Sequence, residues 1–467
     1  MPRKWFSRPV KVVLAFTSLG FVIMIIGSHF WWEAVINGQS TLNSQLIPRF
    51  LETCYSSDTL TNEKLKSLMF PDGTDVRRLA EDHIKRKELL HKTCKAGPEE
   101  NFFEDAREAV TEGNQFLIDD VHRLLYCPIE KVGCSFWKRV FVLLKDQQQG
   151  KSVFNLSGVA VHRRWGLFNT SASKPFLLKY FYLQSYTKFL FVRDPYERLF
   201  SGYIDKIFTP SYQTQGLSEH IRQHFGENLQ PAAMGDRKLA NQTTGSFSCV
   251  TSVSFSEFCR YVTNDIGVAV NAHFTPMYAK CLPCHVGYDF VGKMETFRDD
   301  TNFILTAAGV NVTSVLGPDS SFQTENDLSI MRDVTNRVFD VIISDTRKCF
   351  HKANMLRRTW ATFQIRGYLS IHKKFPVSDE EAENLTSEQF LNLAMKAYEN
   401  SGSREECMRQ RKTAILEAFY NIPRSLLKKV EFFVQKDCLL FGYECNVDQR
   451  FPENQAPQPV FKFDTMI

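Results

Sequence analysis

One stretch of the chain, from Phe189 to Lys206, constrains the fold more than any other. The run from Phe189 to Val192 is short and wholly apolar, which is the pattern of a strand buried on both faces. Asp194 and Pro195 follow at once, as an N-cap residue and the first residue of a helix would. Apolar residues then recur at helical spacing, at Tyr196, Leu199, Phe200, Tyr203, Ile204 and Ile207. The stretch therefore predicts an α/β fold in which a buried strand leads directly into a helix.

Arg193 ends the predicted strand, at the place where α/β folds commonly bind anions. Arg198 and Ser201 follow on the predicted helix. Taken alone, these residues fit an ordinary strand–helix connection with solvated charges. A second stretch upstream changes that interpretation.

The upstream stretch has the same layout of strand, short loop and helix. Leu124 to Cys127 is predicted to be the first core strand, and a helix with Phe136 on its apolar face is predicted to reach about Gln147. Lys131 lies in the loop between them. Loop amides and the helix N-terminus supply donors for a phosphate group, and Lys131 supplies positive charge. The Walker A pattern is absent, so the loop is not a P-loop of the nucleotide-triphosphatase type.

Near the N-terminus, Val12 to Trp32 carries no formal charge and, at about 21 residues, is long enough to cross a bilayer. Basic residues precede it at Arg3, Lys4, Arg8 and Lys11, which predicts a cytosolic N-terminus. A cleaved signal peptide is the alternative, but its apolar core would be shorter and would end in small residues. Here the run ends in aromatic residues from Phe30 to Trp32. We therefore predict a single-pass type II membrane protein with a retained signal-anchor.

The rest of the chain agrees with a secretory-pathway lumen. All twelve cysteines follow the apolar segment, and an even number permits disulfides in an oxidising compartment. Sequons predict N-glycosylation at Asn155, Asn169, Asn241, Asn311 and Asn384. The net charge of +5 is mild and does not indicate nucleic acid, which the lumenal side excludes as a partner.

The chain is predicted to divide into segments 1–11 (cytosolic tail), 12–32 (signal-anchor), 33–118 (lumenal stem), 119–450 (main domain) and 451–467 (C-terminal tail). The charged stretch Val76–Lys92 is interpreted as a solvated helix of the stem. The interval 318–407 matches no motif and is a candidate insertion. Inside it, basic and aromatic residues interleave from Arg357 to Lys374. This pattern fits a groove for an acidic glycan and an amphipathic helix with a solvated basic side about equally.

Together the two strand–helix stretches resemble the 5′-phosphosulfate and 3′-phosphate binding motifs of membrane-bound carbohydrate sulfotransferases. In the branch that includes the HNK-1 and chondroitin/dermatan 4-O-sulfotransferases, the first motif resembles P-K-V-A-C-T-N-W-K-R; Glu130 to Arg139 here read E-K-V-G-C-S-F-W-K-R. The second resembles V-R-[ED]-P-[FY]-E-R-L-x-S, which Val192 to Ser201 match. Asn271–Thr296 is similar to the family's H-x-x-P, C-x-P-C and Y-D-x-V-G-K-x-E-T block, and Lys436–Tyr443 to its closing segment.

The resemblance implies the sulfotransferase fold, a P-loop-like parallel sheet flanked by helices, and a Golgi enzyme of class EC 2.8.2. The sulfuryl donor would be 3′-phosphoadenosine 5′-phosphosulfate (PAPS), with no metal. The acceptor would be a glycan or proteoglycan: N-acetylgalactosamine 4-O in chondroitin or dermatan, or glucuronic acid 3-O in an HNK-1-type glycan. Implied PAPS contacts are Lys131, Val132, Gly133, Cys134, Ser135, Phe136, Arg193, Asp194, Pro195, Tyr196, Glu197, Arg198, Leu199, Phe200 and Ser201. Lys131 would meet the charge on the leaving oxygen, and Arg193 with Ser201 would hold the 3′-phosphate.

A general base must take the proton of the acceptor hydroxyl. His273 is the first candidate, because imidazole titrates near neutral pH and this residue lies in a matched segment. His162 is the second and Glu295 the third, and either histidine could instead be structural. Cys281 and Cys284 form a C-x-x-C pair with no second pair at metal spacing, so we expect disulfides, with partners left open, rather than a zinc site.

Two alternatives to this function remain at the level of sequence. A lumenal glycosyltransferase would share the anchor, stem and sequons, but the D-x-D metal motif that many of them use is absent. A catalytically inactive glycan-binding protein on the same scaffold would not need Lys131, Arg193 and Ser201. The sequence leaves the oligomeric state open.

Overall fold

Strands β2, β3 and β4 run parallel within one sheet, and β1 pairs antiparallel with β2, in the order β1-β2-β3-β4. The strands are Leu117–Asp119 (β1), Leu124–Cys127 (β2), Thr187–Val192 (β3) and Phe290–Lys293 (β4). This computed structural model describes residues 77–96, 116–146, 152–163, 186–226, 253–264, 271–344 and 351–461. The predicted α/β fold and both predicted strands are confirmed, while the short strand β1 was not expected.

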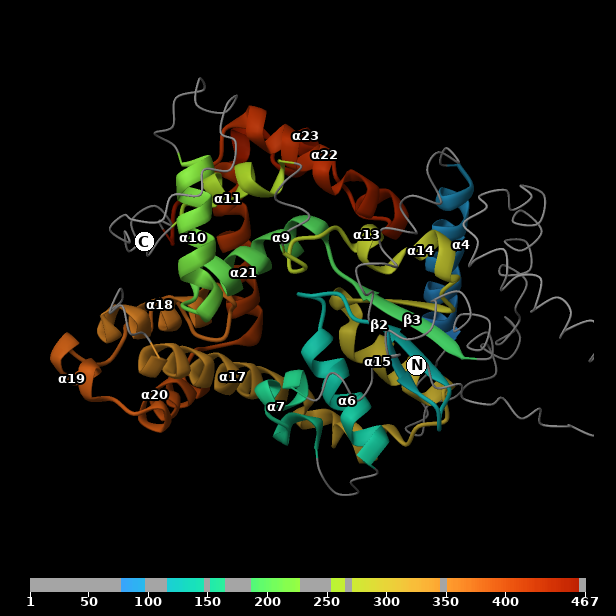
Figure 1. The fold of residues 1–467 in the computed structure, drawn as a ribbon, viewed down its shortest axis with the longest axis horizontal. Helices are drawn as coiled ribbons and strands as arrows, with labels where there is room; N and C mark the ends of the chain where they lie inside the picture. The colour runs from blue at the N-terminus through green and yellow to red at the C-terminus, as the bar shows by residue number, and fades with distance from the viewer. Residues whose placement is uncertain are drawn as a thin grey trace, which may run out of the picture. The chain divides into compact units, whose positions relative to one another are not determined.

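Each motif lies on a connection from a strand to a helix, which we call a corner. The two corners leave the sheet at the same edge. Cys127, the last residue of β2, lies opposite Leu190 of the parallel strand β3. A short loop joins β2 to α6 (Cys134–Asp146), and β3 leads into α9 (Pro195–Tyr203). Because the carboxyl ends of parallel strands meet at one edge, the two loops emerge beside each other, as Figure 1 allows the reader to follow.

Aromatic side chains pack the sheet against its helices. Tyr126 of β2 stacks on Phe189 of β3 with 5.0 Å between ring centroids, and Trp137 of α6 meets Phe189 at 4.6 Å. All three side chains are fully buried. Burial of rings of this size contributes on the order of 2 kcal/mol each, which holds both corners on a stiff support.

Helix α4 (Arg77–Ala96) packs against β4 and against the C-terminal helix α22. Its buried side chains are Leu79, Ala80, His83 and Leu90. Cys94, near its end, is joined to Cys284 by a disulfide. The interpretation of this stretch as a solvated helix is therefore wrong. Its apolar pattern is weak because the buried face includes His83, which lies 3.3 Å from the carboxylate of Asp300.

The helices around α9 share one apolar core, which includes Tyr203, Phe258 and Phe419. The longer ones are α10 (Tyr212–Phe225), α11 (Phe255–Val262), α21 (Arg404–Tyr420) and α22 (Arg424–Phe441). The sheet is further flanked by α15 (Phe297–Ala307). Short helices are α7 (Gly158–Arg163), α13 (Met277–Cys281), α14 (Pro283–Val286), α16 (Val312–Leu316) and α23 (Val447–Arg450). The 3-10 helices are η1 (Val153–Asn155), η6 (Met294–Thr296), η7 (Asp319–Ser321) and η8 (Glu453–Gln455).

The interval 318–407 is folded into helices with an apolar core of their own, centred on Trp360, Phe363 and Phe390. These helices are α17 (Phe322–Ser344), α18 (Lys352–Ile365), α19 (Asp379–Asn384) and α20 (Ser387–Glu399). Helix α18 also packs against α21 and against η4 (Ile204–Phe208), a π-helix that continues α9. The interval is therefore a packed part of the fold and lies within reach of the site.

Three disulfides link described cysteines: Cys94–Cys284, Cys127–Cys281 and Cys438–Cys445. The expectation that the C-x-x-C pair forms disulfides is confirmed, and each of its cysteines has a partner distant in sequence. The disulfide between Cys127 and Cys281 ties the end of β2 to the end of α13. Cys134, Cys259 and Cys407 are free and buried.

Some of the sequence-based predictions concern residues outside the described ranges. The predicted anchor, 12–32, and the sequons at Asn169 and Asn241 lie outside the described residues. No helix inside the described ranges has the length and apolar character required to cross a membrane. The sequon residues Asn155, Asn311 and Asn384 are all exposed.

Candidate functional site

The loop between β2 and α6 makes a tight turn that places Lys131. Lys131 itself has a φ of +71°, and Gly133 has a φ of +84°. A Cβ atom at Gly133 would lie 2.7 Å from the ring of Phe297, so both the backbone conformation and the space require glycine. The loop therefore presents the Lys131 side chain and the N-terminus of α6 in a fixed relation.

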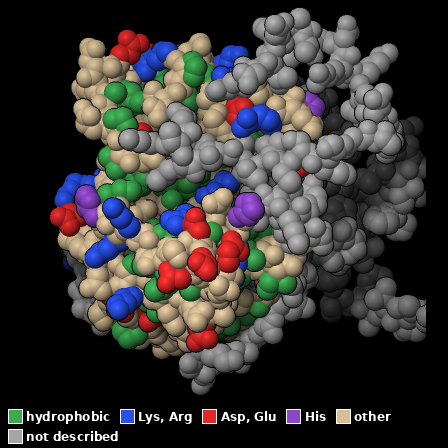
Figure 2. All heavy atoms as spheres, turned by 90° about the vertical axis from the view of Figure 1, so that its left-hand side faces the viewer, with side chains coloured by type: hydrophobic (Ala, Val, Ile, Leu, Met, Phe, Trp, Pro, Cys, Tyr) green, Lys and Arg blue, Asp and Glu red, His purple; other side chains and the backbone are tan. Residues whose placement is uncertain are grey.

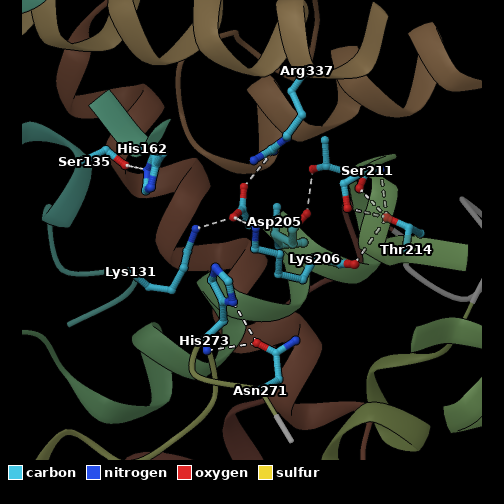
Figure 3. A network of polar contacts seen from close by, with 12 residues as sticks. Lys131, Ser135, His162, Asp205, Lys206, Ser211, Thr214, Asn271, His273 and Arg337 are labelled. Atoms are coloured by element: carbon cyan, nitrogen blue, oxygen red, sulfur yellow. Dashed lines mark hydrogen bonds and ion pairs between the residues drawn. The ribbon is translucent and has the colours of Figure 1, made fainter. Parts of the chain in front are cut away.

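Four cations approach the buried carboxylate of Asp205, which lies on η4. Figure 3 labels Lys131, Lys206 and Arg337 around it. Lys131 Nζ lies 3.0 Å from Oδ2, and Lys206 Nζ lies 3.6 Å from the same oxygen. Arg337 and Arg366 reach Oδ1 through their Nη2 atoms at 2.8 and 3.1 Å. Burial alone would raise the pKa of Asp205, but these four charges hold that pKa well below its usual range.

The same surroundings affect Lys131. Burial lowers the pKa of Lys131 to about 8, opposed by the charge of Asp205 and reinforced by Arg366 and Lys206. At neutral pH the lysine is therefore still mainly protonated, but close to losing its proton. An ammonium group has three N–H donors, so the contact with Asp205 leaves others for a ligand.

Arg193 lies at the second corner, where α9 begins. Its neighbour Asp194 caps the helix by accepting a hydrogen bond from the Glu197 amide at 3.0 Å, with Pro195 as the first helical residue. Arg193 is 7% exposed and donates to Glu197 Oε2 at 3.1 Å, while its buried Nε has no hydrogen-bond partner among the residues that the structure describes. Arg411 of α21 also donates to Glu197, at 3.4 Å.

The two corners belong to one charged site. Burial, with the nearby charge of Arg193, lowers the pKa of Arg411 to about 10, and Arg366 acts in the same direction. Arg366 in turn pairs with Asp205, the partner of Lys131. We call these residues the cationic cluster: Lys131, Arg193, Lys206, Arg337, Arg366 and Arg411. Its six cations share the carboxylates of Asp205 and Glu197, so the surface carries excess positive charge for an anionic ligand.

Arg198 makes two hydrogen bonds to backbone carbonyls, and its buried Nη2 has no partner among the described residues. Its Nε donates to the carbonyl of Glu130 at 3.0 Å and its Nη1 to the carbonyl of Thr275 at 2.9 Å. The side chain is buried. Arg198 therefore joins the first loop to the segment that carries His273, and holds the corners together.

Several other motif residues pack in the core. Phe136 is buried among aromatic rings, with the ring of Phe297 at 5.0 Å, and Tyr196 donates to the Cys445 carbonyl at 2.8 Å. Buried motif residues with apolar surroundings also include Val132, Cys134, Leu199 and Phe200. Such side chains fix the corners, and only their backbones are suited to ligand contact. Ser135 and Ser201 are half-buried.

His273 lies beside the cluster, next to Lys131 and below Asp205 in Figure 3. Asn271 Oδ1 accepts from the His273 backbone amide at 3.0 Å and lies 2.7 Å from the ring Nδ1. Because the same oxygen accepts the amide, Nδ1 must carry the ring hydrogen, which leaves Nε2 as the basic nitrogen. Burial, together with the charges of Lys206 and Lys131, lowers the pKa of His273 to about 2.

His162 is placed differently. Lys138 Nζ lies 3.1 Å from its Nδ1, and Ser135 Oγ lies 3.1 Å from its Nε2. Since an ammonium can only donate, Nδ1 accepts and Nε2–H donates to Ser135. Burial and the charge of Lys138 lower the pKa of His162 to about 4. Both ring nitrogens are engaged, so His162 is suited to orienting Ser135.

The third base candidate, Glu295, is also engaged. One carboxylate oxygen accepts from the Asp194 amide at 3.3 Å, and the other accepts from the Tyr443 hydroxyl at 3.1 Å. The residue thus links the N-cap of α9 to the C-terminal segment. Among the three candidates, His273 is the one best disposed to accept a proton, through its Nε2.

The structure does not support the glycan groove, which was one of the two interpretations of the basic and aromatic stretch from Arg357 to Lys374. Trp360 is buried and donates its indole N–H to the Lys373 carbonyl at 2.7 Å, so its ring cannot stack on a sugar. Arg358 donates to the Ile207 carbonyl at 3.2 Å. The face of the molecule on the α18–α20 side carries interspersed acidic and basic side chains (Figure 2). The alternative interpretation, an amphipathic helix with a solvated basic side, fits only in part, because Arg358 bonds a backbone carbonyl and Arg366 pairs with Asp205.

Sequence reasoning missed five members of the site, namely Asp205, Lys206, Arg337, Arg366 and Arg411. Asp205 lies in the opening stretch and could have been noticed as a carboxylate four residues after Ser201. Arg337, Arg366 and Arg411 carry no motif signal, because they reach the site only through the packing of α17, α18 and α21. Within the described residues, no group of three or more His, Cys, Asp or Glu side chains is arranged to hold a metal ion.

Comparisons with known proteins agree with this geometry. A family model described as "Sulfotransferase family" matches residues 114–352. Carbohydrate sulfotransferase 11 from Rattus norvegicus is 29% identical over 316 residues, covering 65% of this chain and 81% of the relative. Carbohydrate sulfotransferase 9 from Homo sapiens is 32% identical over 238 residues, covering 50% and 49%, and carbohydrate sulfotransferase 14 from Homo sapiens is 30% identical over 241 residues, covering 50% and 59%. No solved structure matches the chain.

Proposed function

The chain belongs to the sulfotransferase family, and on that premise we propose that it transfers a sulfuryl group from PAPS to a hydroxyl group of a glycan. The observation that carries the proposal is the continuity of the cationic cluster. It joins the Lys131 corner and the Arg193 corner, which come from separate parts of the sequence. A donor with anionic groups at both ends needs such a surface. A glycosyltransferase is set aside by the family match.

The residues present fit this donor. Arg193 is a buried guanidinium whose Nε has no partner in the described part of the chain, which would leave it available to a phosphate. Lys131 projects from a glycine-dependent turn beside the N-terminus of α6, a favourable place for a second anion. We therefore assign Lys131 and the amides from Val132 to Phe136 to the phosphosulfate, and Arg193 with Ser201 to the 3′-phosphate.

The reaction needs charge stabilisation and one proton transfer. As the acceptor oxygen bonds to sulfur, the bond between sulfur and the bridging oxygen breaks, and the electron pair stays on the phosphate. Lys131 donates to that oxygen as its charge grows. His273 Nε2 takes the proton of the acceptor hydroxyl. His162 orients Ser135 through a hydrogen bond, and the Ser135 hydroxyl, in the first turn of α6, would be a further donor to the phosphosulfate.

The low pKa of His273 in the free protein is consistent with this role. After burial, the main causes are the positive charges of Lys206 and Lys131. A bound donor would neutralise those charges and shift the pKa of His273 back toward its ordinary value. The base would then become effective when the donor is in place.

The acceptor class is proposed from the relatives, whose names describe carbohydrate sulfotransferases. N-acetylgalactosamine 4-O of chondroitin or dermatan and glucuronic acid 3-O of an HNK-1-type glycan are the two candidates. Incubation of the chain with radiolabelled PAPS and a panel of desulfated glycans separates them. We also propose a Golgi type II membrane protein with the signal-anchor at 12–32, a lumenal stem and glycosylation at the exposed sequons, which glycosidase treatment of the expressed chain would test.

The central experiment substitutes each corner in the full-length chain. Lys131→Ala and Arg193→Ala are expected to abolish sulfate transfer, because each removes the cation that meets one end of the donor. The thermal unfolding midpoint checks that the variants are folded. Wild-type activity in either folded variant would contradict the assignment. If the wild-type chain binds adenosine 3′,5′-bisphosphate in calorimetry but transfers no sulfate to any glycan, the inactive glycan-binding alternative is correct.

A further inference from the structure

Asp205 is the residue on which the cationic cluster converges, and neither motif gives it a role. It is the carboxylate that pairs with Lys131 among the described residues, at 3.0 Å. The same side chain holds Arg337 and Arg366, which come from α17 and from the end of α18. One carboxylate therefore connects the first motif with the helical region 318–407.

The backbone at Asp205 is specialised. Residues Ile204–Phe208 form a π-helix, a rare conformation that is frequent at functional sites. The turn is closed by Thr209, whose amide and hydroxyl both donate to the Ile204 carbonyl, at 2.8 and 2.6 Å. The same hydroxyl is 2.8 Å from the Thr362 hydroxyl of α18. The position of Asp205 is thus fixed by its own turn and by the helical region.

The charges that face Lys131 show what Asp205 contributes. Lys206 lies beside it on η4, Arg337 approaches from α17, and Arg366 from the end of α18. His273 lies on the remaining side, in the segment before α13. Without Asp205, the ammonium of Lys131 would face three cations in a buried place, and it would move away or lose its proton.

We propose that Asp205 is a positioning residue that keeps Lys131 charged and directed at the sulfuryl donor, and that ties the 318–407 region to this site through Arg337 and Arg366. This inference rests on the proposed sulfotransferase function. Asp205 does not act as a stand-in for the donor's anion, because Arg337 and Arg366 hold it in place independently of Lys131. Lys131 can then donate to Asp205 and to the donor at once.

The test compares full-length wild type, Asp205→Asn and Asp205→Glu in a sulfate-transfer assay with radiolabelled PAPS over a range of pH. Asp205→Asn is expected to lower kcat roughly tenfold or more and to move the alkaline limb of kcat/KM to lower pH, since removal of the carboxylate lowers the pKa of Lys131 further. Asp205→Glu keeps the charge and is expected to keep the alkaline limb near its wild-type position, with a smaller loss of kcat.

Asp327→Asn is the matched control. Like Asp205, Asp327 is a buried aspartate, but it lies on α17 and pairs with Arg404 and Tyr398 instead of Lys131. This variant is expected to unfold at a lower temperature with the alkaline limb unchanged. An unchanged limb in Asp205→Asn, or an equal shift in Asp327→Asn, would overturn the inference while leaving the proposed function intact. Tighter donor binding with full kcat in Asp205→Asn would overturn it in favour of a competing carboxylate.

If Asp205→Asn does not fold, Asp205→Glu carries the test alone, and a displaced alkaline limb in that variant would overturn the inference. A folded wild type that transfers no sulfate to any glycan is a separate result, because it overturns the proposed function first.

Discussion

At the scale of single residues, burial and shared charge decide which motif positions can do chemistry. Lys131 and Arg193 lie among cations that outnumber their carboxylates, so each keeps hydrogen-bond capacity for an anion. Arg198, which the motif places beside them, donates through Nε and Nη1 to two backbone carbonyls, while its buried Nη2 has no hydrogen-bond partner among the described residues. Residues of one type within one motif therefore have different roles, and the difference comes from what surrounds them.

The charge on Lys131 predicts how activity depends on pH. Its pKa is lowered to about 8, chiefly by burial. The role proposed for the lysine, stabilising the leaving oxygen, requires its protonated form, so kcat/KM is expected to be retained below that pH and to fall as pH rises through it. A pH profile of sulfate transfer measures this. Full activity maintained far above that pH would show that Lys131 is not needed in its charged form.

The contact between Asn271 and His273 predicts a defined mutational effect. Asn271→Ala removes the acceptor that keeps the ring hydrogen on Nδ1, so Nε2 would no longer be the only basic nitrogen. The expected result is a fall in kcat of roughly tenfold to hundredfold with little change in the KM for PAPS. Asn354→Ala, an exposed position on α18, is the control. Equal effects of the two substitutions on kcat would argue against His273 as the base.

At the scale of elements, the site depends on parts of the chain that carry no motif. Helix α4 precedes the first motif, yet it covers β4 and is joined by Cys94 to Cys284, just after the C-terminal end of α13. Arg86 of the same helix donates to Asp300 at 2.7 Å and to the Val291 carbonyl at 3.0 Å. Helix α4 therefore covers β4, the strand at the end of the sheet order, and bonds to it.

The stabilising effect of that link can be measured by removing it. Cys94→Ser with Cys284→Ser is expected to cost about 2–5 kcal/mol of unfolding free energy, because the disulfide closes a long loop. The sequence separation of this pair is 190 residues, compared with 7 for Cys438 and Cys445. The corresponding double serine variant of the short pair is expected to cost less. Denaturant unfolding of both variants decides, and a larger loss for the short pair would contradict the prediction.

At the scale of the whole molecule, the 318–407 region supplies charge to a site whose motifs lie elsewhere. Arg337 and Arg366 reach Asp205 because α17 and α18 pack around Trp360 and against η4. The proposed donor site thus has the parallel sheet on one side and the helical region on the other. A ligand bound to it would contact both.

This arrangement predicts that the helical region contributes to donor affinity. Arg366→Ala is expected to weaken the binding of adenosine 3′,5′-bisphosphate roughly tenfold and to reduce its dependence on salt, since one charge of the cluster is lost. Arg357→Ala is the control, because that arginine pairs with the exposed Asp379 in the same region. Calorimetry at two salt concentrations measures both. An unchanged affinity of the Arg366→Ala variant for adenosine 3′,5′-bisphosphate would show that the helical region does not contribute to donor binding.

The sequence by itself determined the local elements of the site. Strands β2 and β3, the capped start of α9 and the loop with Lys131 were all predictable, because apolar runs, an Asp-Pro cap and a lysine before a helix are local patterns. The family also followed from residues within the two motifs and their companion segments.

The tertiary structure alone decided which charges share the site. Asp205 gains its role from the π-helix, and Arg337, Arg366 and Arg411 gain theirs from helices that follow the second motif at a distance of more than a hundred residues. Their positions depend on contacts between elements that are remote in sequence. A local pattern cannot encode such contacts, because the same helix could present the same arginine to solvent or to a carboxylate. The physical reason is that side-chain charge is set by residue type, while its electrostatic partner is set by packing.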